Sequence, residues 1–310
     1  MNGVAFIGHF QYTIHMSRKA DTTITLKAPA KINLTLEALA RREDGYHEII
    51  SIIQTVDLFD TLTLAPSKDI SLKCNLKELE SPDNLALKAA RLLSKSIDYK
   101  KGVRIYLNKC IPLSSGLGGG SSNAAAILIG LNLLWDLNLT YLDLSHVAEQ
   151  LGSDVPFFLT GGTAMISGRG EKVRRLSNSD LKWVVILTPT IKMADKTKLA
   201  YEKLNSSHFT SGSLTRKLEA RLRGGGDLPP QLLFNVFDST ARESFPGLSK
   251  YWDTFSNLGA REIHVAGSGP SLYAFVPRKE LGTAIQLLLK HTYGWESHLV
   301  STSDFGILAT

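Results

Sequence analysis

The sequence predicts an α+β fold. Segments with the two-residue alternation of strands and segments with helical periodicity are mixed along the 310 residues, without the strict order of a doubly wound sheet. No segment repeats at a fixed period. The length allows two moderate domains, and 43% hydrophobic residues can supply their cores.

The chain begins with an expected extension and a long strand. Residues 1–20 lack the basic start and the cleavage site of a secretory signal, and we interpret them as a loose N-terminal extension. From Thr22 onward polar and apolar residues alternate, which predicts a half-buried strand. The residues that share its polar face are Lys31, Asn33, Thr35 and Glu37.

Turn and cap signals divide the rest of the first half. Residues 41–45 predict a polar turn, and residues 83–94 predict a helix capped by Ser81 with Pro82 just inside. The other predicted elements are strands at 48–56, 61–64, 103–107 and 160–167, a helix that begins at 121–123, and a helix at 141–151 closed by Gly152.

A buried strand at 183–187, ended by Pro189, marks the predicted start of the second half. We therefore expect an N-terminal domain at 21–178 and a C-terminal domain at 179–310. The later predicted elements are helices at 196–204, 214–222, 232–244, 247–258 and 281–292, strands at 262–266 and 272–276, and a loop at 224–230.

Net charge, cysteine content and apolar runs indicate which partners and which cellular compartment to expect. The formal net charge of +6 comes from scattered basic residues, so a nucleotide or phosphorylated metabolite explains it as well as nucleic acid does. The two cysteines, Cys74 and Cys110, form no metal or disulfide pattern and fit a reducing cytoplasm. No apolar run approaches the ~20 residues of a membrane span, so we expect none.

The segment IPLSSGLGGGSSNAAA, residues 111–126, places four glycines and four serines directly before a predicted helix. Glycines let backbone amides approach an anion, and a helix start adds unpaired N–H groups. The serine hydroxyls can donate to phosphate oxygens or coordinate Mg²⁺. The segment does not match the Walker phosphate-binding motif, because the lysine of that motif is absent. It does not match the dinucleotide-binding motif either, because the third glycine of that motif would fall on Ser121. A phosphate site is predicted, and a helix-capping turn is the alternative.

Three separated segments together resemble one superfamily of small-molecule kinases. They are residues 28–34 (APAKINL), the glycine loop, and residues 266–271 (AGSGPS), and they are similar to kinases named for galactose, homoserine, mevalonate and phosphomevalonate. Within that superfamily, DGYHE at 44–48, GLGGGSS at 116–122 and LGSDVPF at 151–157 resemble the kinases of a cytidine diphosphate-linked methylerythritol. The resemblance covers about residues 25–285.

The resemblance implies two α+β domains with ATP and substrate in the cleft between them. It implies transfer of the ATP γ-phosphoryl to the substrate 2-hydroxyl in the non-mevalonate route to isoprenoids. Mg²⁺ is expected with ATP, with no ligands assigned. A cytoplasmic monomer or weak homodimer is expected, with no nucleic-acid or membrane partner. The residues implied to hold the ATP phosphates are Pro112, Leu113, Ser114, Ser115, Gly116, Leu117, Gly118, Gly119, Gly120, Ser121 and Ser122.

The resemblance also implies roles for residues outside the loop. Phosphoryl transfer to a hydroxyl needs a carboxylate that orients the nucleophile and accepts its proton, and Asp154 matches that position; a helix cap is the alternative. Lys31 is expected beside it as a fixed cation, rather than as a solvated lysine. The implied substrate-binding residues are Asn33, the cytosine-stacking pair Tyr46 and His47, and the turn Gly267, Ser268 and Gly269.

Two rival functions remain open from the sequence. The first is a sister kinase acting on another alcohol, such as homoserine or mevalonate, although DGYHE and the triple glycine argue against it. The second is an RNA-binding module, because the chain is basic. That function predicts clustered arginines with exposed aromatic residues, which the sequence does not offer.

Overall fold

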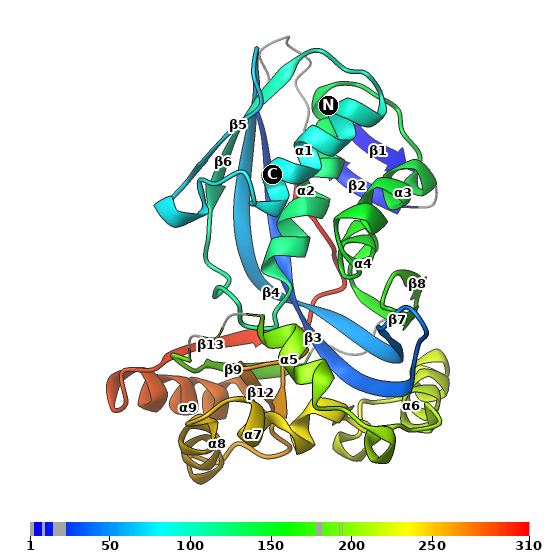
Figure 1. The fold of residues 1–310 in the computed structure, drawn as a ribbon. Coiled ribbons are helices and arrows are strands. Elements are labelled where there is room, and N and C mark those ends of the chain that lie inside the picture. The colour runs from blue at the N-terminus through cyan, green and yellow to red at the C-terminus, as the bar shows by residue number, and fades with distance from the viewer. Residues whose placement is uncertain are drawn as a thin grey trace.

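The computed structural model describes residues 3–7, 10–14, 23–177, 182–191, 193 and 195–309. The predicted α+β class is confirmed: helices and strands are mixed in two units joined by a pair of long curved strands (Figure 1). The expected domain boundaries, after residues 20 and 178, lie outside the described residues. No described helix is long and apolar enough to cross a membrane.

The first unit is a sheet built on two long antiparallel strands, β3 (Ile24–Arg41) and β4 (His47–Ser67). The predicted strands 48–56 and 61–64 are a single strand, because β4 absorbs the interruption as a bulge: Asp57 and Leu58 have no partner in β3, where Pro29 and Ala30 pair with Phe59 and Val56. The strands that extend this sheet are β5 (Ser71–Cys74), β6 (Gly102–Asn108), β7 (Thr163–Gly168) and β8 (Lys172–Arg175).

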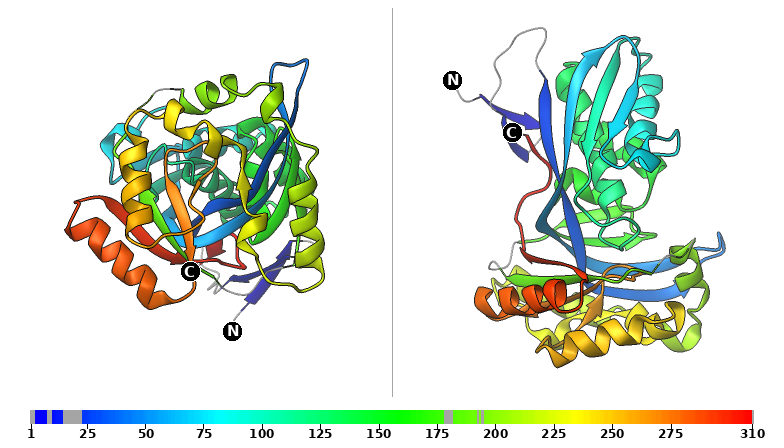
Figure 2. Two further views of the ribbon diagram at one scale, coloured as in Figure 1. Left: turned by 90° about the horizontal axis from the view of Figure 1, so that it is seen from below. Right: turned by 90° about the vertical axis from the view of Figure 1, so that its left-hand side faces the viewer.

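Helices cover one face of this sheet (Figure 2, right). They are α1 (Leu85–Ser96), α2 (Gly119–Leu134), α3 (Tyr141–Leu151) and α4 (Val155–Thr160). The predicted cap of α1 is wrong: Asn84, not Ser81, accepts a hydrogen bond from the amide of Ala86, and Pro82 lies outside the helix. Helix α2 begins at Gly119, two residues before the predicted start, so its first two residues are glycines.

Strand β3 is buried on both faces from Ala28 to Ala38, so the prediction of a half-buried strand is wrong. The second unit covers the face that the sequence pattern assigns to solvent. The polar residues there find partners instead: Glu37 accepts hydrogen bonds from the Thr210 hydroxyl and the Thr215 amide, both at 2.7 Å. This burial removes the site residues of β3 from bulk water.

The second unit has a four-stranded antiparallel sheet in the order β11-β12-β9-β13. Its strands are β9 (Trp183–Thr188), β11 (His264–Val265), β12 (Leu272–Val276) and β13 (Glu296–Ser301). Its helices are α5 (Lys196–Glu202), α6 (Ser213–Arg223), α7 (Ala241–Ser244), α8 (Leu248–Asn257) and α9 (Lys279–His291).

The predicted helix at 232–244 is wrong. The chain forms short helical turns at Pro230–Leu232 and Val236–Ser239, the strand β10 (Phe234–Asn235) between them, and then α7. The side chain of Asn235 donates to the carbonyls of Val265 and Gly267 and accepts from the amide of Phe237. These bonds hold the backbone out of the helical conformation.

The two units share strand pairing as well as contacts. Strand β10 pairs in parallel with β3, and the chain then returns along the sheet to place β14 (Leu308–Ala309) antiparallel to β3 (Figure 2, right). Within the expected extension, β1 (Gly3–Ile7) and β2 (Phe10–Ile14) pair as an antiparallel hairpin.

Candidate active site

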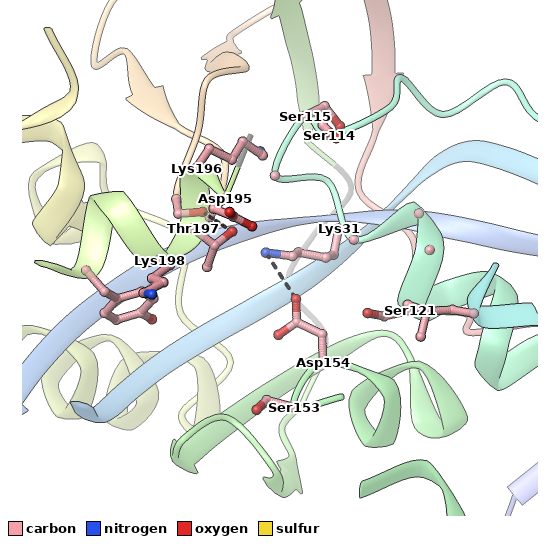
Figure 3. Close-up of a pocket in the computed structure, with 18 of the residues that line it drawn as sticks. Lys31, Ser114, Ser115, Ser121, Ser153, Asp154, Asp195, Lys196, Thr197 and Lys198 are labelled. Carbon is pink, nitrogen blue, oxygen red and sulfur yellow. Dashed lines mark hydrogen bonds and ion pairs between the residues drawn. The ribbon is translucent and has the colours of Figure 1, made fainter. Parts of the chain in front are cut away.

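A cavity of about 1440 Å³ lies where β3, the glycine loop and the first turns of α2, α4 and α5 meet. Residues from distant parts of the chain line it, including Lys31, Tyr46, Ser114, Asp154 and Ser268. Figure 3 shows Lys31 and Asp154 pointing toward one another at its centre. The fold thus gathers residues from the three resembling segments in one cavity.

Lys31 and Asp154 form an ion pair, with Nζ 3.8 Å from Oδ2. The lysine side chain is 5% exposed and the aspartate side chain 35%, so the carboxylate faces the open part of the cavity. Asp154 precedes the first residue of α4, but its side chain makes no capping hydrogen bond. The carboxylate is therefore free to accept a proton from a bound hydroxyl.

The position of Lys31 is fixed by its neighbours on β3 and β4. Its Nζ donates to Oδ1 of Asn33 at 2.8 Å, and Nδ2 of Asn33 donates to the Ser51 hydroxyl at 2.9 Å. The backbone amide of Lys31 donates to the Leu117 carbonyl in the glycine loop. Burial lowers the pKa of Lys31, and the nearby Asp154 partly opposes that shift.

The glycine loop leads into α2 without a side-chain cap. Gly118, the residue before the helix, has a φ of 74° and offers no side chain, so the amides of the first turn lack a capping acceptor. By contrast, α3 begins with a complete capping box formed by Thr140 and Asp143. Unpaired amides at the wall of a cavity can donate hydrogen bonds to phosphate oxygens.

A buried network supports the loop from behind. Asp60, which is fully buried, pairs with Lys109 and accepts hydrogen bonds from the amides of Cys110 and Ile111, each at 2.8 Å. Asn123 in α2 donates to the same carboxylate at 2.9 Å. The network ties the start of the loop to the helix that follows it.

The far end of the cavity is aromatic. The ring of His47 lies 5.2 Å from that of Tyr201 in α5, while the adjacent Tyr46 is 56% exposed. Burial, with a smaller effect of Arg41, lowers the pKa of His47, so its imidazole is neutral at pH 7. Its Nε2 is buried and has no hydrogen-bond partner among the described residues. A planar ligand with polar edge groups would fit there.

Three of the implied binding residues do not line the cavity. Leu117, Ser122 in α2 and Gly269 are buried and do not line it. The other implied residues line it. The Gly267 turn packs against the loop so closely that a Cβ on Gly267 would lie 3.0 Å from the carbonyl oxygen of Gly116.

The sequence pattern misses the contribution of α5. Lys196, Thr197 and Tyr201 line the cavity, and nothing local in 195–202 distinguishes them from an ordinary surface helix. The network of Asp60, Lys109 and Asn123 also escapes sequence analysis, because its members are far apart in the chain.

Comparisons with known proteins agree with one another. Residues 84–162 match the N-terminal domain of the GHMP kinases. A 4-diphosphocytidyl-2-C-methyl-D-erythritol kinase of Dehalococcoides mccartyi is 44% identical over 280 residues, covering 90% of this chain and 98% of the relative. The enzyme of that name in Listeria monocytogenes is 38% identical, covering 82% of this chain and 87% of the relative.

Solved structures agree. A crystal structure of 4-(cytidine 5'-diphospho)-2C-methyl-D-erythritol kinase superimposes with a TM-score of 0.76 at 30% identity, covering 90% of this chain and 99% of that one. A crystal structure of L. major mevalonate kinase superimposes with a TM-score of 0.68 at 15% identity, covering 93% of this chain and 99% of that one. The two proteins therefore share the fold. The chain therefore belongs to the 4-diphosphocytidyl-2-C-methyl-D-erythritol kinase family of the GHMP kinases.

Proposed function

We propose that the protein transfers the γ-phosphoryl group of ATP to the 2-hydroxyl of 4-diphosphocytidyl-2-C-methyl-D-erythritol, in the non-mevalonate route to isoprenoid precursors. Family membership supports the reaction, and one observation supports the site: the Lys31–Asp154 pair lies in the same cavity as the uncapped start of α2. A donor phosphate and an acceptor hydroxyl can therefore meet there.

The chemistry follows from the geometry. The first-turn amides of α2 bind the ATP phosphates, and the exposed carboxylate of Asp154 orients the 2-hydroxyl and accepts its proton. The hydroxyl oxygen bonds to the γ-phosphorus as the bond to the ADP oxygen breaks. The ammonium of Lys31 stabilises the charge on the transferred group.

Mg²⁺ is part of the proposal. The described residues contain no group of three metal-ligating side chains, which fits an ion that keeps its waters and is held mainly by substrate phosphates. Ser121, which lines the cavity in the first turn of α2, would supply a protein ligand. The ion would neutralise phosphate charge.

The aromatic end of the cavity is assigned to cytosine. Tyr46 offers an exposed ring for stacking, and we assign His47, which lines the same end of the cavity, to the edge of the base. Asn33 and the Gly267 turn line the cavity in contact with Lys31, and we assign them to the methylerythritol. We also propose a cytoplasmic location, because both cysteines are free thiols. We propose in addition that the protein is a monomer or a weak homodimer.

A coupled ADP-release assay tests the function. The wild type should turn over the cytidyl substrate in preference to homoserine and mevalonate, and Asp154→Asn should lower kcat about 10²- to 10⁴-fold because it removes the base. Asp253→Asn, an exposed aspartate on α8, is the matched control and should retain full activity. If the enzyme phosphorylates another of these alcohols faster than the cytidyl compound, the proposed substrate is wrong. An unchanged rate for Asp154→Asn would exclude Asp154 as the base.

A further inference from the structure

Lys196, the first residue of α5, lies across the cavity from the Lys31–Asp154 pair (Figure 3). Its Nζ donates to the carbonyl of Gly269, and the hydroxyls of the adjacent Thr197 and of Ser268 lie 3.1 Å apart. These two contacts fasten the first turn of α5 to the Gly267 turn. The ammonium is thereby held at the cavity wall.

The charge of Lys196 is not matched by a protein group. Among the described residues no carboxylate lies within ion-pair distance of its Nζ, and Asp154 is paired with Lys31. Burial, and then repulsion from Lys31, lower the pKa of Lys196 to about 8. A partly buried cation without a counter-charge raises the free energy of the ligand-free protein. An anionic ligand would supply the missing counter-charge.

The position of Lys196 indicates which anion it meets. Tyr201, on the same helix, lies against His47 at the aromatic end, about 7.5 Å further along the axis. The ATP phosphates are assigned to the glycine loop and the start of α2. Because Gly116 of that loop contacts the Gly267 turn, ATP is the competing anion that the experiment must include. Lys196 opens α5 at the Gly267 turn, which contacts Lys31, and Tyr201 lies further along the helix at the aromatic end. Helix α5 thus runs from the transfer centre toward the aromatic end, along the path of a diphosphate that links the base to the reacting alcohol.

We propose that Lys196 is a substrate-binding residue whose ammonium pairs with the diphosphate of the cytidyl substrate. The proposal rests on the proposed function and adds a recognition element to it. The aromatic end selects the base, Lys196 selects the diphosphate, and the Lys31–Asp154 pair acts on the hydroxyl.

Calorimetric titration of the whole protein with cytidine, CMP and CDP tests the proposal. Lys196→Gln should weaken CDP binding about 10- to 100-fold, because a hydrogen bond between charged groups is lost. It should change cytidine binding less than twofold, since cytidine has no phosphate, and Lys196→Arg should restore part of the CDP affinity. The matched control is Lys203→Gln, an exposed lysine at the end of the same helix and outside the cavity.

A non-hydrolysable ATP analogue forms the second arm, and Lys196→Gln should bind it like the wild type. Loss of analogue affinity with unchanged CDP affinity would assign Lys196 to ATP and overturn the proposal. Equal loss of cytidine and CDP affinity would mean that the lysine only supports the fold, which also overturns it. The proposed function fails separately: it fails if the wild type does not phosphorylate the cytidyl substrate, whatever the behaviour of Lys196→Gln.

Discussion

Gly116 shows how tightly single residues constrain the site. Its φ is 86°, and a Cβ there would lie 1.9 Å from the carbonyl oxygen of Ala266. The loop and the 266–269 turn are also joined by a hydrogen bond from the amide of Ser271 to the carbonyl of Ser115. Any side chain at Gly116 must separate two backbones that both contribute to the cavity.

We therefore expect Gly116→Ala to destabilise the fold by more than about 3 kcal/mol, since it adds a backbone clash to the left-handed strain of about 1–2 kcal/mol. Gly247→Ala is the matched control: its φ is 87°, but nothing lies within 4 Å of its Cβ position. This variant should therefore lose only the stability that the left-handed backbone strain costs. Urea unfolding of both variants measures the difference. Equal losses would mean that the loop and the turn separate at little cost.

The lowered pKa of Lys196 gives a second prediction at this scale. Its pKa is about 8 in the folded protein and 10.5 for an unperturbed lysine, so its charge opposes folding below pH 8. As the pH rises from 8 to 10.5, the folded state releases the proton first and the free energy of unfolding increases. Lys196→Met keeps the apolar stem and should stabilise the ligand-free protein by up to about 1 kcal/mol at pH 7.

The gain from Lys196→Met should shrink toward zero as the pH approaches 10.5. Urea unfolding at pH 7 and at pH 9.5, with the exposed Lys203→Met as control, measures it. A gain that does not depend on pH would show that the charge of Lys196 costs the fold nothing. Together with weakened CDP binding, the expected result would mean that this residue is kept for ligand recognition at the expense of stability.

At the scale of elements, the glycine loop depends on the buried pair of Asp60 and Lys109. Both side chains are at most 4% exposed, and the same carboxylate accepts the amides of Cys110 and Ile111. Asp60→Asn keeps an oxygen for those amides but leaves the lysine charge buried without a counter-charge, since its remaining partner, Asn123, is neutral. We expect the free energy of unfolding to fall by about 3–5 kcal/mol.

The double variant Asp60→Asn with Lys109→Met removes both charges and should recover at least half of that loss, because no buried charge is left unpaired. Urea unfolding of the wild type, both single variants and the double variant gives the coupling free energy. Additive losses would contradict a direct interaction between the two charges.

Elements were predictable where their signals are local. The bounds predicted for α3 and β12 agree with the structure, since the period of each and the Gly152 stop lie within a few residues. Two failures have distant causes: Asn235 prevents a helix at 232–244 by bonding to residues near 265, and the second unit buries the polar face of β3. The Lys31–Asp154 pairing depended on motif resemblance, and Lys196 carried no local signal at all.

At the scale of the whole molecule, the two units are interleaved. Strands β10 and β14 come from the C-terminal half of the chain but pair with β3, and Tyr273 donates its hydroxyl to the carbonyl of Asn33 at 2.5 Å. Asp57 in β4 accepts hydrogen bonds from the amide and hydroxyl of Ser301. The division into domains at 21–178 and 179–310 remains our proposal, and these links mean that neither part completes its sheet or cavity alone.

We therefore expect a single cooperative unfolding transition. Trp135 stacks on Tyr99 in the first unit, and Trp295 lies 4.3 Å from Tyr251 in the second, so each tryptophan reports on one unit. In chains that keep only Trp135 or only Trp295, with the other tryptophans changed to phenylalanine, the urea midpoint from fluorescence should coincide with that from far-UV circular dichroism.

Because the cavity is lined by both units, CDP at 100 times its Kd should raise the free energy of unfolding measured by either probe by about 2.7 kcal/mol. Two separated midpoints, or stabilisation of only one unit by CDP, would show that the units fold independently and that the shared strands contribute little.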